Sequence, residues 1–236
     1  MPSTDKRPSL PIYTIVPEAH GFVLCRDAAP MKTPAGSSFV LPTRVLAEKI
    51  AEEWRAQGVR VKPETMALTQ LAATALDVLS KKKDEVVANL TAYAASDLLC
   101  HRAEAPPELA ERQAKIWQPW LDWAEENYKV FLRVGQGVMP IVEPESSLSA
   151  LRDVVAAYDL FHLVGLQQAV SVTGSLILGL ALTEKKAATE DLFQAAELDA
   201  LFQMEQWGED PITIERHASV KRELELCLRW ISLLEQ

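Results

Sequence analysis

The sequence is poor in cysteine, which limits the metal and disulfide chemistry it can carry. Its 236 residues include three cysteines, Cys25, Cys100 and Cys227, and no CxxC pair. An odd number of widely spaced cysteines is typical of free thiols in a reducing compartment. We therefore expect no disulfide framework and no metal site.

Motifs of the common catalytic classes are also absent. The sequence contains no P-loop, no HExxH and no GxSxG, so the usual signatures of nucleotide, zinc-protease and serine-hydrolase chemistry are missing. Scattered histidines are more often surface or core residues than bases or ligands, and the four here are scattered: His20, His101, His162 and His217. These absences favour a binding protein that is not an enzyme and has no cofactor.

Positive charge is scarce as well. The chain has 24 lysines and arginines against 33 acidic residues, a net charge of −9. Nucleic-acid binding needs clustered basic residues that contact phosphates, and the one basic run, at 81–83, is typical of a solvated helix start. We expect no nucleic-acid partner.

Signals for export or membrane insertion are weak. Residues 1–11 have no apolar core and contain two basic residues, so we expect neither a secretory signal nor an organellar presequence. Residues 163–182 approach the length of a membrane span, but Gln167 and Gln168 lie within this stretch together with three glycines. Polar residues at mid-span are costly in lipid, so we expect a buried helix of a helical domain and no membrane insertion.

Apolar periodicity predicts an α+β protein, with strands first and helices after them. Three short apolar runs separated by turn residues predict a small antiparallel β meander, at 12–16, 22–25 and 38–41. Helical periodicity follows at 44–57, 65–79, 84–99, 107–128, 147–160, 163–182, 183–208 and 211–234. We expect an N-terminal α/β domain at 1–82, with helices beside the meander, and an all-helical C-terminal domain at 83–236.

The stretch 183–208 is unusual because apolar residues surround the predicted helix on nearly every side. We expect Thr183 to cap its start and Gly208 to end it. A helix that is apolar all round is normally buried. Asp199, Gln203 and Gln206 nevertheless share one stripe, at spacings of four and three. An acid in this setting either has a hidden partner or faces a groove.

Several segments in a fixed order resemble one protein family. They are KTPAG at 32–36, the stretches 41–54 and 66–77, DLLCHR at 97–102, WQPW with WA at 117–124, and QMEQWG at 203–208. Their order and spacing resemble the ATP-twelve family, the alpha-subunit-specific assembly chaperones of the F-type ATP synthase catalytic sector. The resemblance runs from about Tyr13 to the last helix.

The resemblance implies a chaperone without ATPase activity. It would hold the newly folded alpha subunit on the surface that later meets the beta subunit, until beta replaces it. It also implies a small β-containing N-terminal domain and a helical C-terminal domain. Family members occur in mitochondria, where the matrix is the expected location, and in bacteria. Because no presequence is evident, we expect a bacterial cytoplasmic protein.

The family has a functionally important acid on the helix before the Trp-Gly pair, and by position this acid matches Asp199. The chain departs from the family at Ala200, where relatives often have a second acid, and at Ala28–Ala29, where they tend to have Gly-Arg. An acid in a groove can recognise an arginine or backbone donors of a client. The residues expected to bind the client are Asp199, Gln203, Glu205, Gln206 and Trp207. In the alternative interpretation, Asp199 caps or pairs inside the helical domain.

Two other functions are open from the residues alone. One is a small-molecule enzyme with a cleft between the two domains, around Asp97, His101 and Arg102; the other is a helical adaptor that forms homo-oligomers. A polar cleft with strongly perturbed acids would favour the enzyme. We expect Asp97 and Arg102 to form an internal ion pair after the helix at 84–99.

Overall fold

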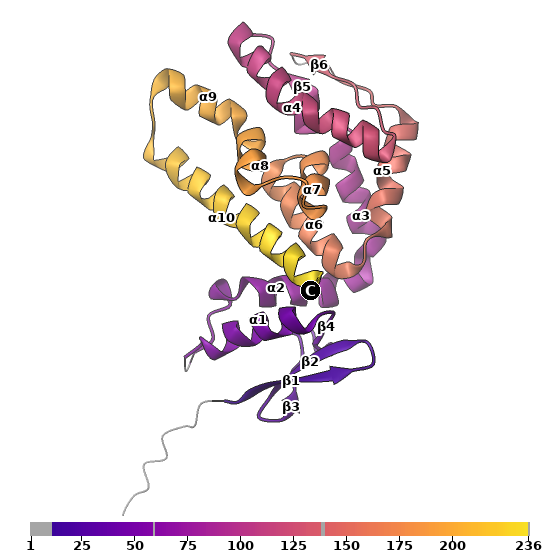
Figure 1. The fold of residues 1–236 in the computed structure, drawn as a ribbon, viewed down its shortest axis with the longest axis vertical. Coiled ribbons are helices and arrows are strands. Elements are labelled where there is room, and N and C mark those ends of the chain that lie inside the picture. Colours follow the sequence, from indigo (N-terminus) through magenta and orange to yellow (C-terminus); the bar gives the residue numbers. More distant parts are fainter. Residues whose placement is uncertain (1–10, 59, 138–139, 236) are drawn as a thin grey trace, which may run out of the picture. The chain divides into compact units, whose positions relative to one another are not determined.

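The computed structural model describes residues 11–58, 60–137 and 140–235 (Figure 1). These residues form two compact units. The N-terminal unit contains the described residues up to Val78 together with those from Leu233 onward, and the helical unit spans Leu79–Ser232. The boundary expected between residues 82 and 83, which would separate an α/β domain from an all-helical domain, stays a prediction.

The N-terminal unit contains the expected antiparallel strands. β2 (Gly21–Arg26) is central and pairs with β1 (Tyr13–Glu18), β3 (Ala29–Pro30) and β4 (Val40–Leu41). Gly21 begins β2 at a φ of +146°, and a Cβ there would lie 2.3 Å from the carbonyl oxygen of Leu41. Only glycine fits such a close backbone approach. The short strand β3 lies where the sequence predicted a turn.

Helices follow the strands within the same unit. α1 (Arg44–Arg55) begins as predicted, with Leu46 N donating to Thr43 Oγ1 at 3.1 Å. Its buried face, which includes Leu46 and Ile50, packs against β1 and β2. A 3₁₀ turn (Pro63–Thr65) leads into α2 (Ala67–Thr74), and a π-helical turn follows at Ala75–Leu79.

The helical unit is built from α3 to α10. Its elements are α3 (Ser80–Ala94), a 3₁₀ turn (Leu98–Cys100), β5 (His101–Arg102), α4 (Pro107–Tyr128), β6 (Gly135–Gln136), α5 (Glu145–Ala157), α6 (Leu160–Thr173), α7 (Leu176–Thr183), α8 (Thr189–Ala196), α9 (Leu198–Trp207) and α10 (Pro211–Leu234). The α+β fold class is confirmed. β5 and β6 form a two-residue parallel pair that the sequence did not predict.

The single helix predicted at 163–182 is wrong, because the chain breaks between α6 and α7. Gly174 ends α6 in the left-handed region at a φ of +67°, and Leu178 N donates to Ser175 Oγ at 3.1 Å, which caps α7. All eight residues of α7 are buried. None of the helices in the described residues is both long enough and apolar enough to cross a membrane.

The single helix predicted at 183–208 is also wrong. Thr183 is the last residue of α7, and its Oγ1 donates to Gly179 O at 2.9 Å instead of capping a new helix. Two shorter helices follow, α8 and α9, which are separated at Glu197. Gly208, with a φ of +91°, does end α9.

Other predicted bounds are close to those observed. α4 begins and ends where the sequence predicted and continues through Pro119 without splitting. The helix predicted at 84–99 begins earlier, at Ser80, and ends at Ala94. Asp210 caps α10, because its Oδ1 accepts hydrogen bonds from Ile212 N and Thr213 N at 3.0 Å.

Candidate functional site

The start of α9 is fixed by a buried acid. Glu197, with 3% of its surface exposed, lies at the break between α8 and α9. Arg216 of α10 donates to Glu197 Oε1 at 2.8 Å. His217 Nε2 lies 3.3 Å from Oε2, but neither atom forms a hydrogen bond within the described residues. Burying a carboxylate is costly without a partner, so the start of α9 depends on Arg216 of α10.

One face of α9 packs against α4. The predicted site residue Asp199 is half-buried there, and its Oδ1 accepts a hydrogen bond from Gln113 Nε2 at 2.7 Å. Gln113 is 1% exposed, and its Oε1 accepts from Ala103 N at 2.7 Å. The carboxylate therefore has an internal partner. Whether it also binds a client stays a prediction.

A second contact between α9 and α4 lies at the surface. Arg112 donates to both carboxylate oxygens of Glu205, at 2.7 and 2.8 Å. These hydrogen bonds lower the pKa of Glu205 and raise that of Arg112. The guanidinium also lies 5.3 Å from the centre of the Phe202 ring, so it covers the buried aromatic side chain of α9.

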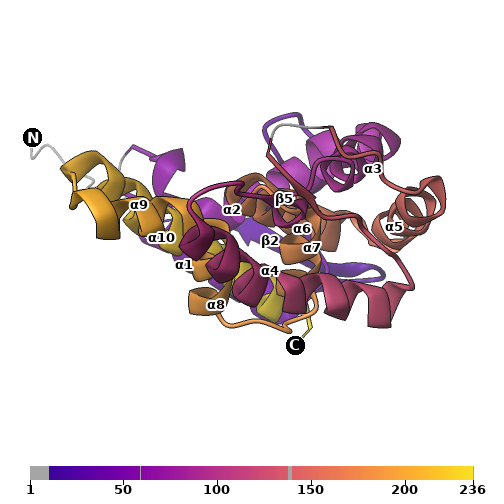
Figure 2. The same ribbon diagram turned by 90° about the horizontal axis from the view of Figure 1, so that it is seen from above.

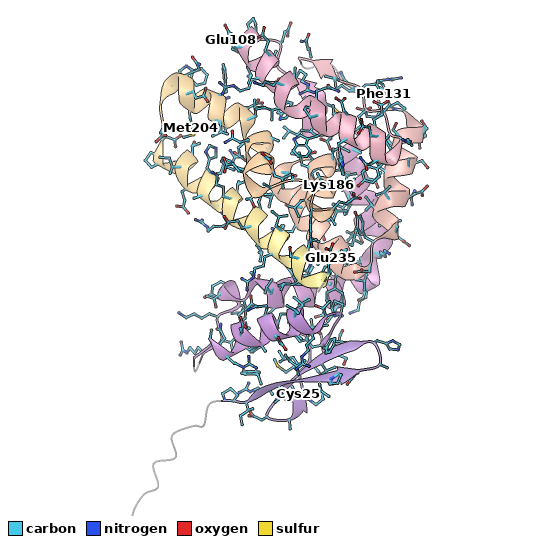
Figure 3. All side chains as sticks on the ribbon, viewed as in Figure 1. Cys25, Glu108, Phe131, Lys186, Met204 and Glu235 are labelled. Atoms are coloured by element: carbon cyan, nitrogen blue, oxygen red, sulfur yellow. The ribbon has the colours of Figure 1, made fainter. Side chains whose placement is uncertain are left out.

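The other face of α9 is open to solvent. Gln203, Met204 and Trp207 line a groove of about 390 Å³, which Thr213 and Arg216 of α10 close from the other side. Figure 1 shows α9 and α10 joined by the short 208–210 connection, Figure 2 shows the same pair from above, and Met204 is labelled on α9 in Figure 3.

Large apolar side chains are exposed at this end of the two helices. Trp207 is 81% exposed, and Ile212, in the first turn of α10, is 82% exposed. An isolated exposed apolar residue is ordinary, but an apolar group beside a groove is typical of a binding surface. We call the groove together with Trp207 and Ile212 the α9–α10 surface.

The five predicted contact residues therefore lie in different surroundings. Gln203 and Trp207 line the groove, Gln206 is exposed outside its lining, and Asp199 and Glu205 bind α4. Sequence reasoning missed Ile212, although an isoleucine that directly follows a capping Asp-Pro pair must lie in the first helical turn. It also missed the contact between Gln113 and Asp199, because no local sequence pattern indicates a contact between residues so far apart in the chain.

The cluster around Asp97 is structural. Asp97 is completely buried and accepts hydrogen bonds from Leu99 N at 3.1 Å and Ile177 N at 3.3 Å. Burial raises its pKa to about 6, although a hydrogen bond from Ser175 opposes this shift. A carboxylate enclosed in this way secures the start of α7 and offers no face to a substrate.

The ion pair expected between Asp97 and Arg102 is wrong. Arg102 instead donates to Gln113 O at 2.7 Å, and its guanidinium lies 5.1 Å from the centre of the Trp117 ring. The two side chains bind different groups because backbone amides already occupy the carboxylate. The described residues contain no group of three His, Cys, Asp or Glu side chains that could hold a metal ion.

Comparison with known proteins gives consistent matches. The model of the family described as ATP12 chaperone protein matches residues 13–125. The crystal structure of Atp12 from Paracoccus denitrificans is 35% identical, with a TM-score of 0.90, and the match covers 94% of this chain and 95% of that one. The structure of an aspartate-to-lysine mutant of P. denitrificans Atp12p gives the same values. A crystal structure of a protein from Agrobacterium tumefaciens is 33% identical, with a TM-score of 0.88, over 94% of this chain and 84% of that one.

Proposed function

This chain belongs to the ATP12 chaperone family, and from this premise we propose that it binds the alpha subunit of the F-type ATP synthase catalytic sector during assembly. It acts by binding alone, without catalysis. We infer the client from the family resemblance, and we propose that it binds at the α9–α10 surface. We propose the bacterial cytoplasm as the compartment in which it works.

The observation that carries the proposal is the exposed indole of Trp207 beside the groove. Protein interfaces have apolar, aromatic centres surrounded by polar groups. Trp207 and Ile212 provide the apolar centre, and the exposed amides of Gln203 and Gln206 provide neutral hydrogen-bonding groups at its edge. Tryptophan is among the residues that contribute most to binding when an interface buries them.

The client surface in this proposal is the beta-facing side of alpha. The resemblance implies that beta covers this side in the finished complex, and the interfaces of permanent complexes are more apolar than other protein surfaces. A chaperone has to cover it and then release it to beta. A small binding surface centred on one tryptophan is suited to a temporary complex. The larger and more complementary interface between alpha and beta can then replace it.

A capture experiment tests the proposal. The tagged chain is co-expressed with alpha or with beta, and the bound fraction is measured after purification. We expect capture of alpha but not beta, and release of alpha when beta is added. The proposal fails if neither subunit is captured under conditions in which alpha alone aggregates. Val142→Ser is a matched control for loss of an exposed apolar residue, because Val142 is 73% exposed and lies on the 140–144 segment, outside the α9–α10 surface.

A further inference from the structure

The N-terminal unit contains an apolar groove of about 330 Å³ that the proposed client surface does not use. Its apolar lining comes mainly from Met31, Phe39, Trp54, Val61, Met66 and Ala73. A volume of this size is in the range of sites that bind small ligands or a few side chains. Three of the segments that carry the family resemblance, at 32–36, 41–54 and 66–77, contribute residues to this groove.

The walls of the groove are held in place by hydrogen bonds. The 33–36 turn is tied to Asp77, which accepts from Thr33 Oγ1 at 2.6 Å and from Ala35 N at 3.0 Å. The start of α2 is tied to α1, because Glu53 accepts from Leu68 N and Thr69 N, each at 2.9 Å. A groove that is already formed needs little ordering when a ligand binds.

Among the described residues that line the groove, Lys32 is the one that carries a charge. Its side chain is exposed, and within residues 11–58, 60–137 and 140–235 it forms no ion pair. This charge favours an occupant that carries a carboxylate.

We propose that this groove binds an extended polypeptide segment with an apolar anchor side chain and an adjacent acidic residue. The apolar side chain enters the lining, and the acid lies by Lys32. The proposal rests on the proposed function in one respect, since the segment is taken to belong to the client. It gives the chaperone a second anchor point, on the N-terminal unit.

Fluorescence polarisation tests this with the full chain and a labelled peptide that contains a Leu-Phe pair flanked by glutamates. Ala73→Phe fills the groove, and we expect at least about tenfold weaker binding. Lys32→Glu reverses the rim charge and should weaken binding about threefold. Lys81→Glu makes the same charge change at an exposed residue outside the groove and should leave the affinity unchanged.

The outcomes separate this inference from the proposed function. Failure of the wild-type chain to bind the peptide, or wild-type affinity in folded Lys32→Glu and Ala73→Phe variants, would overturn the groove while alpha capture still stood. Equal binding of a peptide with lysines in place of the glutamates would also overturn it. A dimer that the peptide dissociates would assign the groove to a second copy of the chain and contradict the proposal. Peptide binding without alpha capture would instead remove the proposed function and support the groove.

Discussion

The two faces of α9 carry similar side chains in opposite situations. Toward α4, the Phe202 ring is 7% exposed and Asp199 accepts a hydrogen bond from Gln113. Toward α10, the Trp207 indole is 81% exposed and Gln203 lines an open groove. Each face therefore has an aromatic ring and a polar group, but one face is filled by the chain itself and the other is not.

This difference teaches that residue type alone does not decide the role of a residue on α9. Side chains with internal partners contribute to stability, because removing them leaves a cavity or an unsatisfied polar group. Side chains without partners contribute little to stability and are available to a client. Mutations on the two faces should therefore separate stability from binding.

The largest expected effect on stability is at the inner face. Phe202→Ala removes a buried ring under the Arg112 guanidinium and should lower the free energy of unfolding by about 3–4 kcal/mol. Urea denaturation monitored by circular dichroism would measure this. The matched control is Trp207→Ala, which removes a larger ring but should change the stability by less than about 0.5 kcal/mol. Similar losses in both variants would break the comparison.

The largest expected effect on binding is at the outer face. Trp207→Ala should reduce capture of alpha by at least about tenfold, because an aromatic side chain at the centre of an interface contributes about 2 kcal/mol or more. The co-purified fraction of alpha gives the readout, and an unchanged melting temperature shows that the fold is intact. Undiminished capture would move the client surface away from α9.

Asp199 tests the boundary between the two faces. Asp199→Ala leaves the buried amide of Gln113 without an acceptor, and we expect a loss of about 1–2 kcal/mol in the free energy of unfolding. Asp199→Asn keeps an acceptor of nearly the same shape and should cost less. A double-mutant cycle with Gln113→Ala would measure the coupling of the pair.

The result at Asp199 also decides between the two interpretations of this acid. If capture of alpha falls only in proportion to the loss of folded protein, the carboxylate has a structural role. Lost capture in an Asp199→Asn variant of normal stability would show that the carboxylate binds the client. Both interpretations predict the same position on α9, so only the paired measurement distinguishes them.

Much of the fold could be predicted from local signals. The Thr43 cap, the Asp210–Pro211 start of α10 and the bounds of α4 follow from capping residues and apolar periodicity. The family was also predicted correctly, from an ordered set of segments. The break at Gly174–Ser175 was missed, although a left-handed glycine followed by a capping serine is a local signal that could have shown it.

The break at Glu197 could not be predicted in this way. Glutamate is a good helix former, and the break coincides with partners on α10, Arg216 and His217, which lie about twenty residues later in the sequence. The candidate site has the same limitation. Periodicity predicted that Asp199 and Gln203 share one stripe of a helix, but in the structure Gln113 of α4 binds Asp199, whereas Gln203 lines the groove.

The smallest expected effect is at the ion pair between Arg112 and Glu205. The side chains of Arg112 and Glu205 are 37% and 53% exposed, and solvent screens such pairs strongly. Glu205→Gln should therefore lower the melting temperature less than Phe202→Ala or Asp199→Ala does, and the difference should disappear in high salt. If Glu205 serves α4 and not the client, capture of alpha should also stay at the wild-type level. If capture of alpha is lost while the stability is unchanged, Glu205 contacts the client although it also pairs with Arg112 of α4. The division of α9 into a structural face and a binding face would then be wrong for Glu205.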